Sequence, residues 1–457
     1  MDDFNNINEI STPQFVGDPD SSLIKVIGVG GGGGNAVNYM YGQEIPNVRF
    51  VVCNTDRQHL SDSPVPHKVL LGENITRGRG AGNKPEVGKM CAEDSAEEIK
   101  HLFEDGTEMV FITAGMGGGT GTGAAPVVAK LAKEAGMLTI GIVTVPFMFE
   151  GNSKILKALD GANEMRDHVD ALLLINNENL IELYPDLSFF NAFEKADETL
   201  ANAARSISDI ISEKCYINVD FEDVRTTLKD SGTAIISTAY GEGEHRVSDA
   251  IYNALRSPLL KAHDIYTSKR LLLKFSCSRF SENAPKAQEL SEITQFTSKL
   301  PSSIDVKWGV ADDPTMGDKV KVTVLASGFD VTLSEAGSKE KKEDEKKKVI
   351  VFESNAKTEE KQRQEESEDR IAEVYGTDKV IKQKRNAARM KYAVLTPDQF
   401  DDHEVIEKIE SCPTFTRDPR FNEELKKISK NSGITSTDNS RGGSHDTETI
   451  SFGDWDD

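Results

Sequence analysis

The sequence has few cysteines and no long apolar run, and both shortages exclude whole classes of protein. Its five cysteines, Cys53, Cys91, Cys215, Cys277 and Cys412, form no CxxC pair, and their odd number argues against a disulfide framework. No run approaches the roughly eighteen apolar residues that a membrane-spanning helix needs. Residues 1–22 are polar and acidic, unlike a signal or transit peptide. We therefore expect a protein of the reducing cytoplasm without direct membrane insertion.

Positive charge is also in short supply. The formal net charge is −22, with 76 acidic against 54 basic residues, so nucleic acid is not an expected partner. The sequence contains no GxxxxGK[ST] pattern, which excludes an ordinary P-loop enzyme.

The patterning predicts an α/β fold with a parallel, Rossmann-like sheet, followed by a long central helix and a second, smaller α/β domain. Buried strands alternate with helix-like stretches in the first half. An apolar stripe from Phe193 to Ile210 recurs at helical spacing, which predicts one long amphipathic helix. The predicted strands are Leu23–Val29, Arg49–Cys53, Met109–Thr113, Leu138–Val145, Ala171–Ile175, Thr233–Ala239, Leu271–Ser276, Ile304–Val310 and Lys319–Ala326.

Changes in composition divide the chain into seven segments. We expect a disordered N-terminal extension at 1–22, a nucleotide-binding domain at 23–190, the central helix at 191–215 and the second domain at 216–328. We expect a flexible charged linker at 329–401, which contains the run KEKKEDEKKK at Lys339–Lys348. Apolar and aromatic residues return in 402–428, and a Ser/Thr/Asp/Gly-rich disordered tail follows at 429–457.

Two glycine clusters carry the chemical signal. Each follows a buried strand and opens a helix, where backbone amides can approach phosphate oxygens. The first, Gly28–Gly33, satisfies GxGxxG, and Asp56 could contact a ribose, so an NAD(P)-binding oxidoreductase is a real alternative. The second, Gly117–Gly123, reads GGGTGTG. A dinucleotide site has no need of this second loop, whereas a triphosphate with its metal does.

The chain resembles the tubulin/FtsZ family of GTPases from about Ile24 to Phe329. The GGGTGTG loop is the highly specific family signature, and further matches run through the chain. These are IKVIGVGGGGGNAV at Ile24–Val37, NTD at Asn54–Asp56, GAG at Gly80–Gly82, PEVG at Pro85–Gly88, PFMFEG at Pro146–Gly151, INVDFEDVRT at Ile217–Thr226 and SPLL at Ser257–Leu260. The resemblance implies a GTPase that polymerises head to tail into the cell-division ring, in the cytoplasm at the division site, with GTP or GDP and Mg2+ as its ligands.

The resemblance also implies a set of nucleotide contacts. By this resemblance, the two glycine loops bind the phosphates and Glu150 contacts the ribose. Phe193 and Asp197 contact the base, together with Asn177. A carboxylate suits guanine, which offers two donors on one edge. Without the resemblance, Phe193 could be core packing and Asp197 a solvated helix face. The full set is Gly31, Gly32, Gly33, Gly34, Asn35, Asn54, Asp56, Gly80, Ala81, Gly82, Gly118, Gly119, Thr120, Gly121, Thr122, Glu150, Lys154, Asn177, Phe193 and Asp197.

Catalysis is implied for Asn218, Asp220 and Asp223. In the family this loop enters the nucleotide pocket of the next subunit, so that hydrolysis depends on assembly. No fixed protein ligands for the metal are expected: Mg2+ would be held through the phosphates, with Asp220 as a candidate further ligand. Read without the family, Asp223 would be a favourable charge in the first turn of a helix.

The segment Cys412–Arg417 (CPTFTR) is similar to the family's terminal P-x-[FY]-x-R peptide. Such peptides bind membrane-tethering division proteins, such as an FtsA-like adaptor. A chance match within a polar tail is the alternative.

Three positions depart from the family pattern. Lys154 stands where the family often has Arg, and lysine cannot make the bidentate phosphate contact of arginine. Cys215 replaces a usual glycine, and would be strained if its φ were positive. Thr267–Cys277 lacks the expected small residues. A scaffold that binds GTP but hydrolyses it poorly because of Cys215 is therefore a second alternative.

Overall fold

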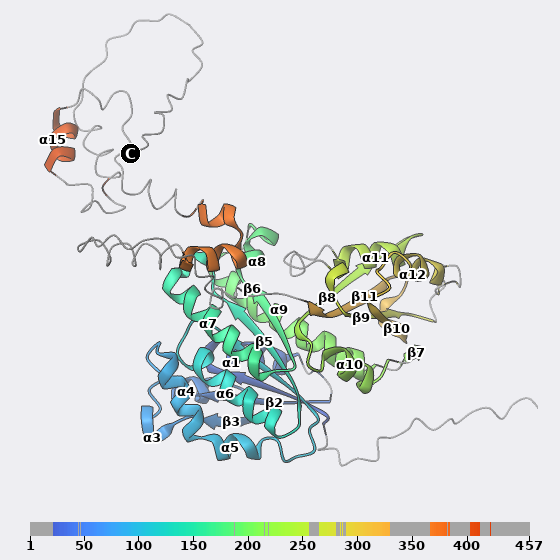
Figure 1. Ribbon diagram of the computed structural model, residues 1–457, viewed down its shortest axis with the longest axis horizontal. Helices are drawn as coiled ribbons and strands as arrows, with labels where there is room; N and C mark the ends of the chain where they lie inside the picture. The colour runs from blue at the N-terminus through green and yellow to red at the C-terminus, as the bar shows by residue number, and fades with distance from the viewer. Residues whose placement is uncertain are drawn as a thin grey trace, which may run out of the picture. The chain divides into compact units, whose positions relative to one another are not determined.

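The computed structural model describes residues 22–43, 45, 47–186, 188–213, 215–217, 219–255, 265–279, 284, 286, 289–329, 366–381, 383, 403–411 and 421. The chain divides into one unit that ends at Gly376 and another that begins at Thr377. Figure 1 shows the course of the chain, coloured from blue at the N-terminus to red at the C-terminus. Residues 1–21, the tail 429–457, Asn218 and Cys412–Arg417 lie outside the described residues.

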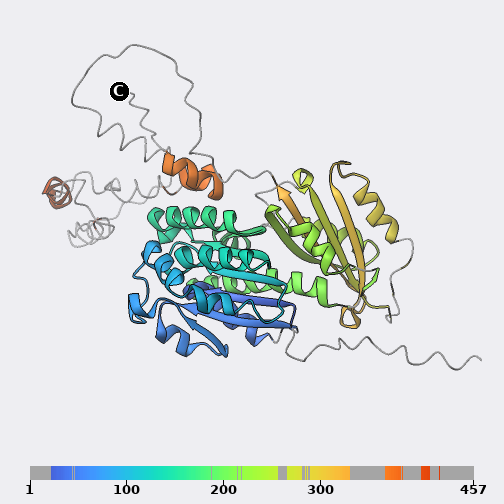
Figure 2. The same cartoon turned by 60° about the horizontal axis from the view of Figure 1, so that its bottom comes forward.

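The first half of the main unit is a parallel sheet in the order β3-β2-β1-β4-β5-β6. This is the strand order of doubly wound nucleotide-binding folds. The strands are β1 (Ile24–Val29), β2 (Val48–Asn54), β3 (His67–Leu70), β4 (Met109–Gly115), β5 (Leu138–Val145) and β6 (Ala171–Asn176). Helices cover the sheet (Figure 2): α1 (Gly30–Gly42), α2 (Arg57–Asp62), α3 (Glu73–Thr76), α4 (Pro85–Asp94), α5 (Ala96–His101), α6 (Thr120–Glu134), α7 (Asn152–His168) and α8 (Glu178–Leu183).

The second half is a mixed sheet that continues the first. Strand β8 (Gly232–Gly241) pairs in parallel with β6 at only two residue pairs, and the order then runs β8-β11-β9-β10-β7. The strands are β7 (Cys215–Ile217), β9 (Arg270–Cys277), β10 (Asp305–Asp312) and β11 (Val320–Phe329). Helices α10 (Phe221–Leu228), α11 (Arg246–Leu255) and α12 (Leu290–Thr297), with the short turns η2 (Ile265–Thr267) and η3 (Pro314–Met316), complete this domain. The predicted parallel-sheet domain and second α/β domain are confirmed.

Helix α9 (Phe189–Ser212) is the predicted central helix. Its buried stripe includes Leu200, Ile207 and Ile210, which belong to the core of the parallel sheet. Ser188 caps its start by accepting a hydrogen bond from the Asn191 amide. Its far end is tied to the second domain by ion pairs described below. The predicted amphipathic helix is thus the element that lies between the two halves of the sheet.

The C-terminal end of α9 is held by two lysines from the second domain. Lys274 is 2 % exposed; its Nζ donates to the Asp209 and Ile210 carbonyls and lies 2.9 Å from Glu213 Oε2. Lys321 Nζ lies 3.2 Å from Glu213 Oε1. Lys274 therefore satisfies the Ile210 carbonyl, one of those that a helix end leaves open, whereas Lys321 contacts the carboxylates of Asp209 and Glu213.

Residues 366–375 differ from the flexible linker predicted for 329–401, because they form a helix in the main unit. Ile371 and Tyr375, one helical turn apart, are each 2 % exposed. These two side chains give a short helix one buried face within a charged sequence. In the second unit, α15 (His403–Ser411) is helical. No helix among the described residues is long and apolar enough to cross a bilayer.

Candidate functional site

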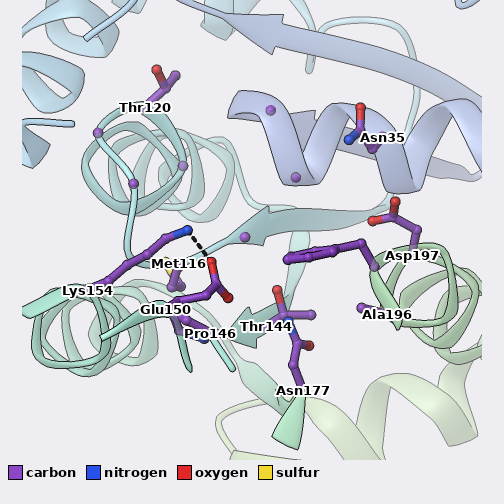
Figure 3. A pocket seen from close by; sticks show the side chains of 17 residues that line it. Asn35, Met116, Thr120, Thr144, Pro146, Glu150, Lys154, Asn177, Ala196 and Asp197 are labelled. Carbon is purple, nitrogen blue, oxygen red and sulfur yellow. Dashed lines mark hydrogen bonds and ion pairs between the residues drawn. The ribbon is translucent and has the colours of Figure 1, made fainter. Parts of the chain in front are cut away.

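A cavity of about 450 Å³ lies at the carboxyl edge of the parallel sheet (Figure 3). Strands β1 and β4 are neighbours in the sheet, so the loops that follow them meet at this edge. The cavity is lined by Gly31, Gly32, Asn35, Gly115, Met116, Gly118, Gly119, Thr120, Gly121, Thr144, Pro146, Glu150, Lys154, Asn177, Phe193, Ala196 and Asp197. Both glycine clusters and the start of the central helix therefore face one space.

Helices α1 and α6 both begin at the wall of this cavity. Neither has a side-chain cap, and neither has an acidic residue in its first turn. By contrast, Asp56 caps α2 and Asp220 caps α10. A helix N-terminus with open amides and no neighbouring carboxylate favours an anion. The arrangement is suited to a chain of phosphates held from two sides.

Close backbone packing explains why glycine is needed at the two loops. A Cβ on Gly33 would lie 2.2 Å from the Thr113 carbonyl oxygen, and one on Gly121 would lie 2.6 Å from the Gly115 carbonyl oxygen. Neither position can accept a side chain without moving a strand end. The glycines thus allow α1 and α6 to approach β4 closely, which brings their N-termini together.

Several predicted nucleotide contacts are not among the residues that line the cavity. Thr122 Oγ1 accepts a hydrogen bond from the Gly117 amide at 2.8 Å and so closes the second loop. Asp56 accepts from two amides of α2, and Asn54 Oδ1 accepts from the Asp56 amide. The predicted residues outside the lining set are Gly33, Gly34, Asn54, Asp56, Gly80, Ala81, Gly82 and Thr122.

The residues after β2 contact the second glycine loop, which the sequence did not predict. The hydroxyl oxygens of Thr55 and Thr120 lie 2.6 Å apart in a hydrogen bond. Ala81 is buried, and a Cβ added to Gly119 would lie 2.9 Å from its own Cβ. The stretch 54–56 and the stretch 80–82 therefore support the second glycine loop from behind. No motif signals this, because the contacts are tertiary.

The far end of the cavity suits a base with donor groups. Asp197 is partly buried on α9, and burial, with a smaller contribution from Glu194, raises the pKa of its carboxyl to about 7. Asn177 is buried, and its Oδ1 has no hydrogen-bond partner among the described residues. The Phe193 ring packs edge-on against Phe147 at 5.1 Å between centroids. Two acceptors and an aromatic face fit guanine, which presents adjacent N–H donors.

One side wall is formed by the turn after β5. Glu150 pairs with Lys154, as Figure 3 shows, and its other oxygen accepts from the Phe147 amide at 2.9 Å. The lining residues that the sequence analysis missed are Gly115, Met116, Thr144, Pro146 and Ala196. Most of them stand at or just after a strand end, which is the only signal that could have found them.

The acidic residues predicted to catalyse lie outside this cavity. Asp220 and Asp223 form a capping box at the start of α10: Asp220 Oδ1 accepts from the Asp223 amide at 3.0 Å, and Asp223 Oδ2 accepts from the Asp220 amide at 3.2 Å. Lys307 Nζ lies 2.5 Å from Asp223 Oδ1. Partial burial raises the pKa of the Asp223 carboxyl. The hydrogen bonds from Lys307 and from the Asp220 amide lower it by more, so the pKa of Asp223 lies below its ordinary value.

The backbone at Cys215 does not have the positive φ that would strain a side chain there. Cys215 lies in strand β7 and is not among the described residues with positive φ. Its thiol donates to the Glu213 carbonyl oxygen at 3.4 Å. The positive φ that would have strained a side chain here is not present, so the poorly hydrolysing scaffold loses its structural reason.

The residues in the described part of the chain form no cluster of three or more His, Cys, Asp or Glu side chains that could hold a metal ion.

At one end of the cavity, α1 and α6 begin without acidic residues in their first turns. At the other end, Asn177 and Asp197 offer hydrogen-bond acceptors. This arrangement defines an α/β protein that binds a nucleoside phosphate. Comparison with known families identifies it further. Residues 23–185 match the GTPase domain of the tubulin/FtsZ family, and residues 232–330 match the C-terminal domain of the FtsZ family. The chain therefore belongs to the tubulin/FtsZ family, and its enzymatic activity is GTP hydrolysis. The NAD(P) oxidoreductase alternative is thereby wrong.

Individual relatives agree with the family. The chain is 47% identical over 396 residues to the cell division protein FtsZ of Porphyromonas gingivalis, covering 86% of this chain and 85% of that one. It is 43% identical over 318 residues to that of Aquifex aeolicus, covering 69% and 86%. A solved structure of an empty FtsZ dimer from M. jannaschii is similar at a TM-score of 0.63 and 35% identity, covering 72% of this chain and 96% of that chain.

Proposed function

We propose that this chain is a cell-division GTPase that assembles head to tail into filaments at the division site in the cytoplasm. GTP lies in the cavity with its phosphates between α1 and α6 and its guanine against Phe193, Asp197 and Asn177. Mg2+ is held through the phosphates. The acidic residues of α10 in one subunit complete the site of the next.

One observation carries the shared site. Glu150 and Asp197 are the only carboxylates among the described residues that line the cavity. Glu150 is occupied by Lys154 and the Phe147 amide, and Asp197 stands on α9 at the base end. No carboxylate is left at the phosphate end to orient a water. Asp220 is exposed on the outside of the same subunit, and Asp223 lies beside it. A second copy is the natural source of the missing group.

The proposed roles follow from charge and geometry. Phosphoryl transfer to water needs positioning and charge stabilisation more than covalent chemistry. The capping box and Lys307 hold Asp223 ionised and in one orientation before assembly. Asp220 then faces the incoming phosphate and its cation, and Asp223 orients the water. Asn218, which lies outside the described residues, is proposed to reach the phosphates.

A mixing experiment tests the shared site. Asp223→Ala keeps the cavity and loses the acidic group, whereas Asp197→Ala keeps the acidic group and loses the base contact. Each variant alone should release little phosphate from GTP. In an equal mixture, random head-to-tail contacts should restore about a quarter of the wild-type rate, because one junction in four joins two intact halves. Co-sedimentation checks that mixed filaments form.

A second measurement uses concentration alone. Phosphate release by the wild type should rise more steeply than protein concentration, because active sites form only at junctions. A strictly proportional rise, or an active Asp223→Ala protein, would refute the shared site. Guanine nucleotide binding by Asp223→Ala should match that of the wild type, and this serves as the folding control.

We also propose that Cys412–Arg417 binds a membrane-tethering adaptor of the FtsA kind. The support is its sequence pattern, with an aromatic anchor and a basic residue after the helix α15. Phe415→Ala should abolish co-sedimentation of filaments with adaptor-coated vesicles while leaving GTP turnover unchanged. Equal binding by Phe415→Ala would refute the assignment.

A further inference from the structure

The helix at 366–375 packs onto the nucleotide-binding domain through one face. Ile371 and Tyr375 are each 2 % exposed, whereas Glu366, Asp369 and Glu373 are exposed. The helix ends at Gly376, whose amide donates to the Ala372 carbonyl at 2.8 Å and whose φ is +92°. Glycine at such a helix end accepts the left-handed conformation without a steric cost. The segment is therefore a defined, one-sided element of this unit.

Polar contacts fix the helix to three elements of that domain. The Tyr375 hydroxyl donates to the Pro146 carbonyl at 2.5 Å, after β5. Asn176, the last residue of β6, donates from Nδ2 to the Val374 carbonyl at 3.0 Å. Arg370 pairs with Asp160 of α7 at 2.6 Å. Figure 1 shows the helix, in orange, beside α7. Because these contacts reach three separate parts of the domain, they fix the helix in one position and orientation.

The anchoring residues adjoin the cavity. Pro146 lines it, and Asn176 directly precedes Asn177, which lines it too. Burial raises the pKa of the Tyr375 phenol, and the carboxylates of Glu178 and Glu150 raise it further, so the hydroxyl stays protonated and able to donate. Glu178 also accepts from the Met148 amide at 3.0 Å, in the same turn. The helix thus contacts the outer side of the wall that faces the proposed ribose and base.

We propose that residues 366–375 are a docked strap that holds the β5 and β6 ends of the nucleotide cavity in place and slows nucleotide release. Two of its hydrogen bonds engage the strand-end residues Pro146 and Asn176. A wall fixed in its binding geometry loses less freedom when the ligand enters. The inference rests on the proposed position of the nucleotide in this cavity, and it adds a role for a segment beyond the two matched family domains.

Nucleotide release from the full-length protein tests the strap. The rate is followed with a fluorescent GDP analogue, at a protein concentration at which no filaments sediment. Ile371→Asp places a charge in the buried face and should undock the helix, with release accelerated about tenfold or more. Tyr375→Phe removes one hydrogen bond and should accelerate release between about two- and tenfold. Glu373→Ala, on the exposed face of the same helix, should leave the rate unchanged.

A charge exchange separates docking from damage to the fold. Arg370→Asp alone should accelerate release, and adding Asp160→Arg should restore most of the wild-type rate. Amide hydrogen exchange over 366–375 reports docking directly and should show protection in the wild type but not in Ile371→Asp. A wild type without that protection would overturn the strap, as would an undocked Ile371→Asp that releases nucleotide at the wild-type rate. A wild type that binds no guanine nucleotide would refute the proposed cavity instead.

Discussion

Asp197 should make guanine nucleotide affinity depend on pH near neutrality. An aspartate ordinarily titrates near pH 4. In the nucleotide-free protein, burial and Glu194 raise the pKa of Asp197 to about 7. Guanine presents two N–H donors, which need an ionised acceptor. Binding therefore favours the carboxylate and lowers its pKa, so affinity should rise with pH.

The size of the effect follows from the ionised fraction. With a pKa of about 7, about one molecule in eleven is ionised near pH 6 and about ten in eleven near pH 8. The dissociation constant for GDP should therefore fall about tenfold across this window. The stability of the empty protein has the opposite trend. Because the folded pKa is raised, the stabilising contribution of the protonated group is complete below about pH 4 and is lost as pH rises through about 7.

The assay is equilibrium titration of the protein with GDP across the window, below the assembly threshold. The terminal phosphate of GDP also titrates, near pH 6, so Asp197→Asn serves as the reference. This variant should bind more weakly and show only the phosphate's pH dependence. Glu194→Gln removes the neighbouring charge and should move the wild-type midpoint to lower pH. Affinity that stays flat, or that falls with rising pH, would refute an ionised Asp197 at the base.

Three further perturbations test other parts of the site. Lys307→Ala should raise the pKa of Asp223, so the acid limb of the GTPase pH profile should move to higher pH, whereas Lys307→Arg should keep it; unchanged profiles in both would contradict the pairing. Lys274→Met should lower the free energy of unfolding by about 2–3 kcal/mol in urea titration, because Glu213 and the carbonyls at the end of α9 lose a donor. An unchanged free energy of unfolding would show that these Lys274 contacts do not stabilise the fold. Gly123→Ala would place a Cβ 1.9 Å from a carbonyl oxygen of α4, so GDP binding and melting temperature should both fall, and wild-type values of both would contradict the tight packing.

The sequence predicted the long strands and missed two short ones that are only partly buried. Strand β5 was predicted with the bounds that it has, Leu138–Val145, because all eight residues are buried. Strand β3 was missed because His67 and Lys68 are exposed at the sheet edge. Strand β7 has only three residues and none is fully buried. Partial burial leaves no clear periodicity in a short window.

The site divides in the same way. Glycine positions and their following helices were readable, because only glycine permits the close approach of α1 and α6 to β4. The Thr55–Thr120 hydrogen bond and the Lys307–Asp223 pair join residues far apart in the chain, so no local pattern announces them. The docked helix was hidden for a related reason: Ile371 and Tyr375 are too few to mark an apolar face within a charged stretch.

Helix α9 has a mechanical consequence. Its 24 residues span about 36 Å. Near one end it carries Asp197, which lines the cavity, and near the other end Lys274 and Lys321 form ion pairs that join it to the second domain. Among the described residues, strand pairing joins the two sheets at only two residue pairs. A helix of this length is stiff and contacts elements of both sheets, so a movement of the second domain that shifts its far end would also shift Asp197 at the cavity.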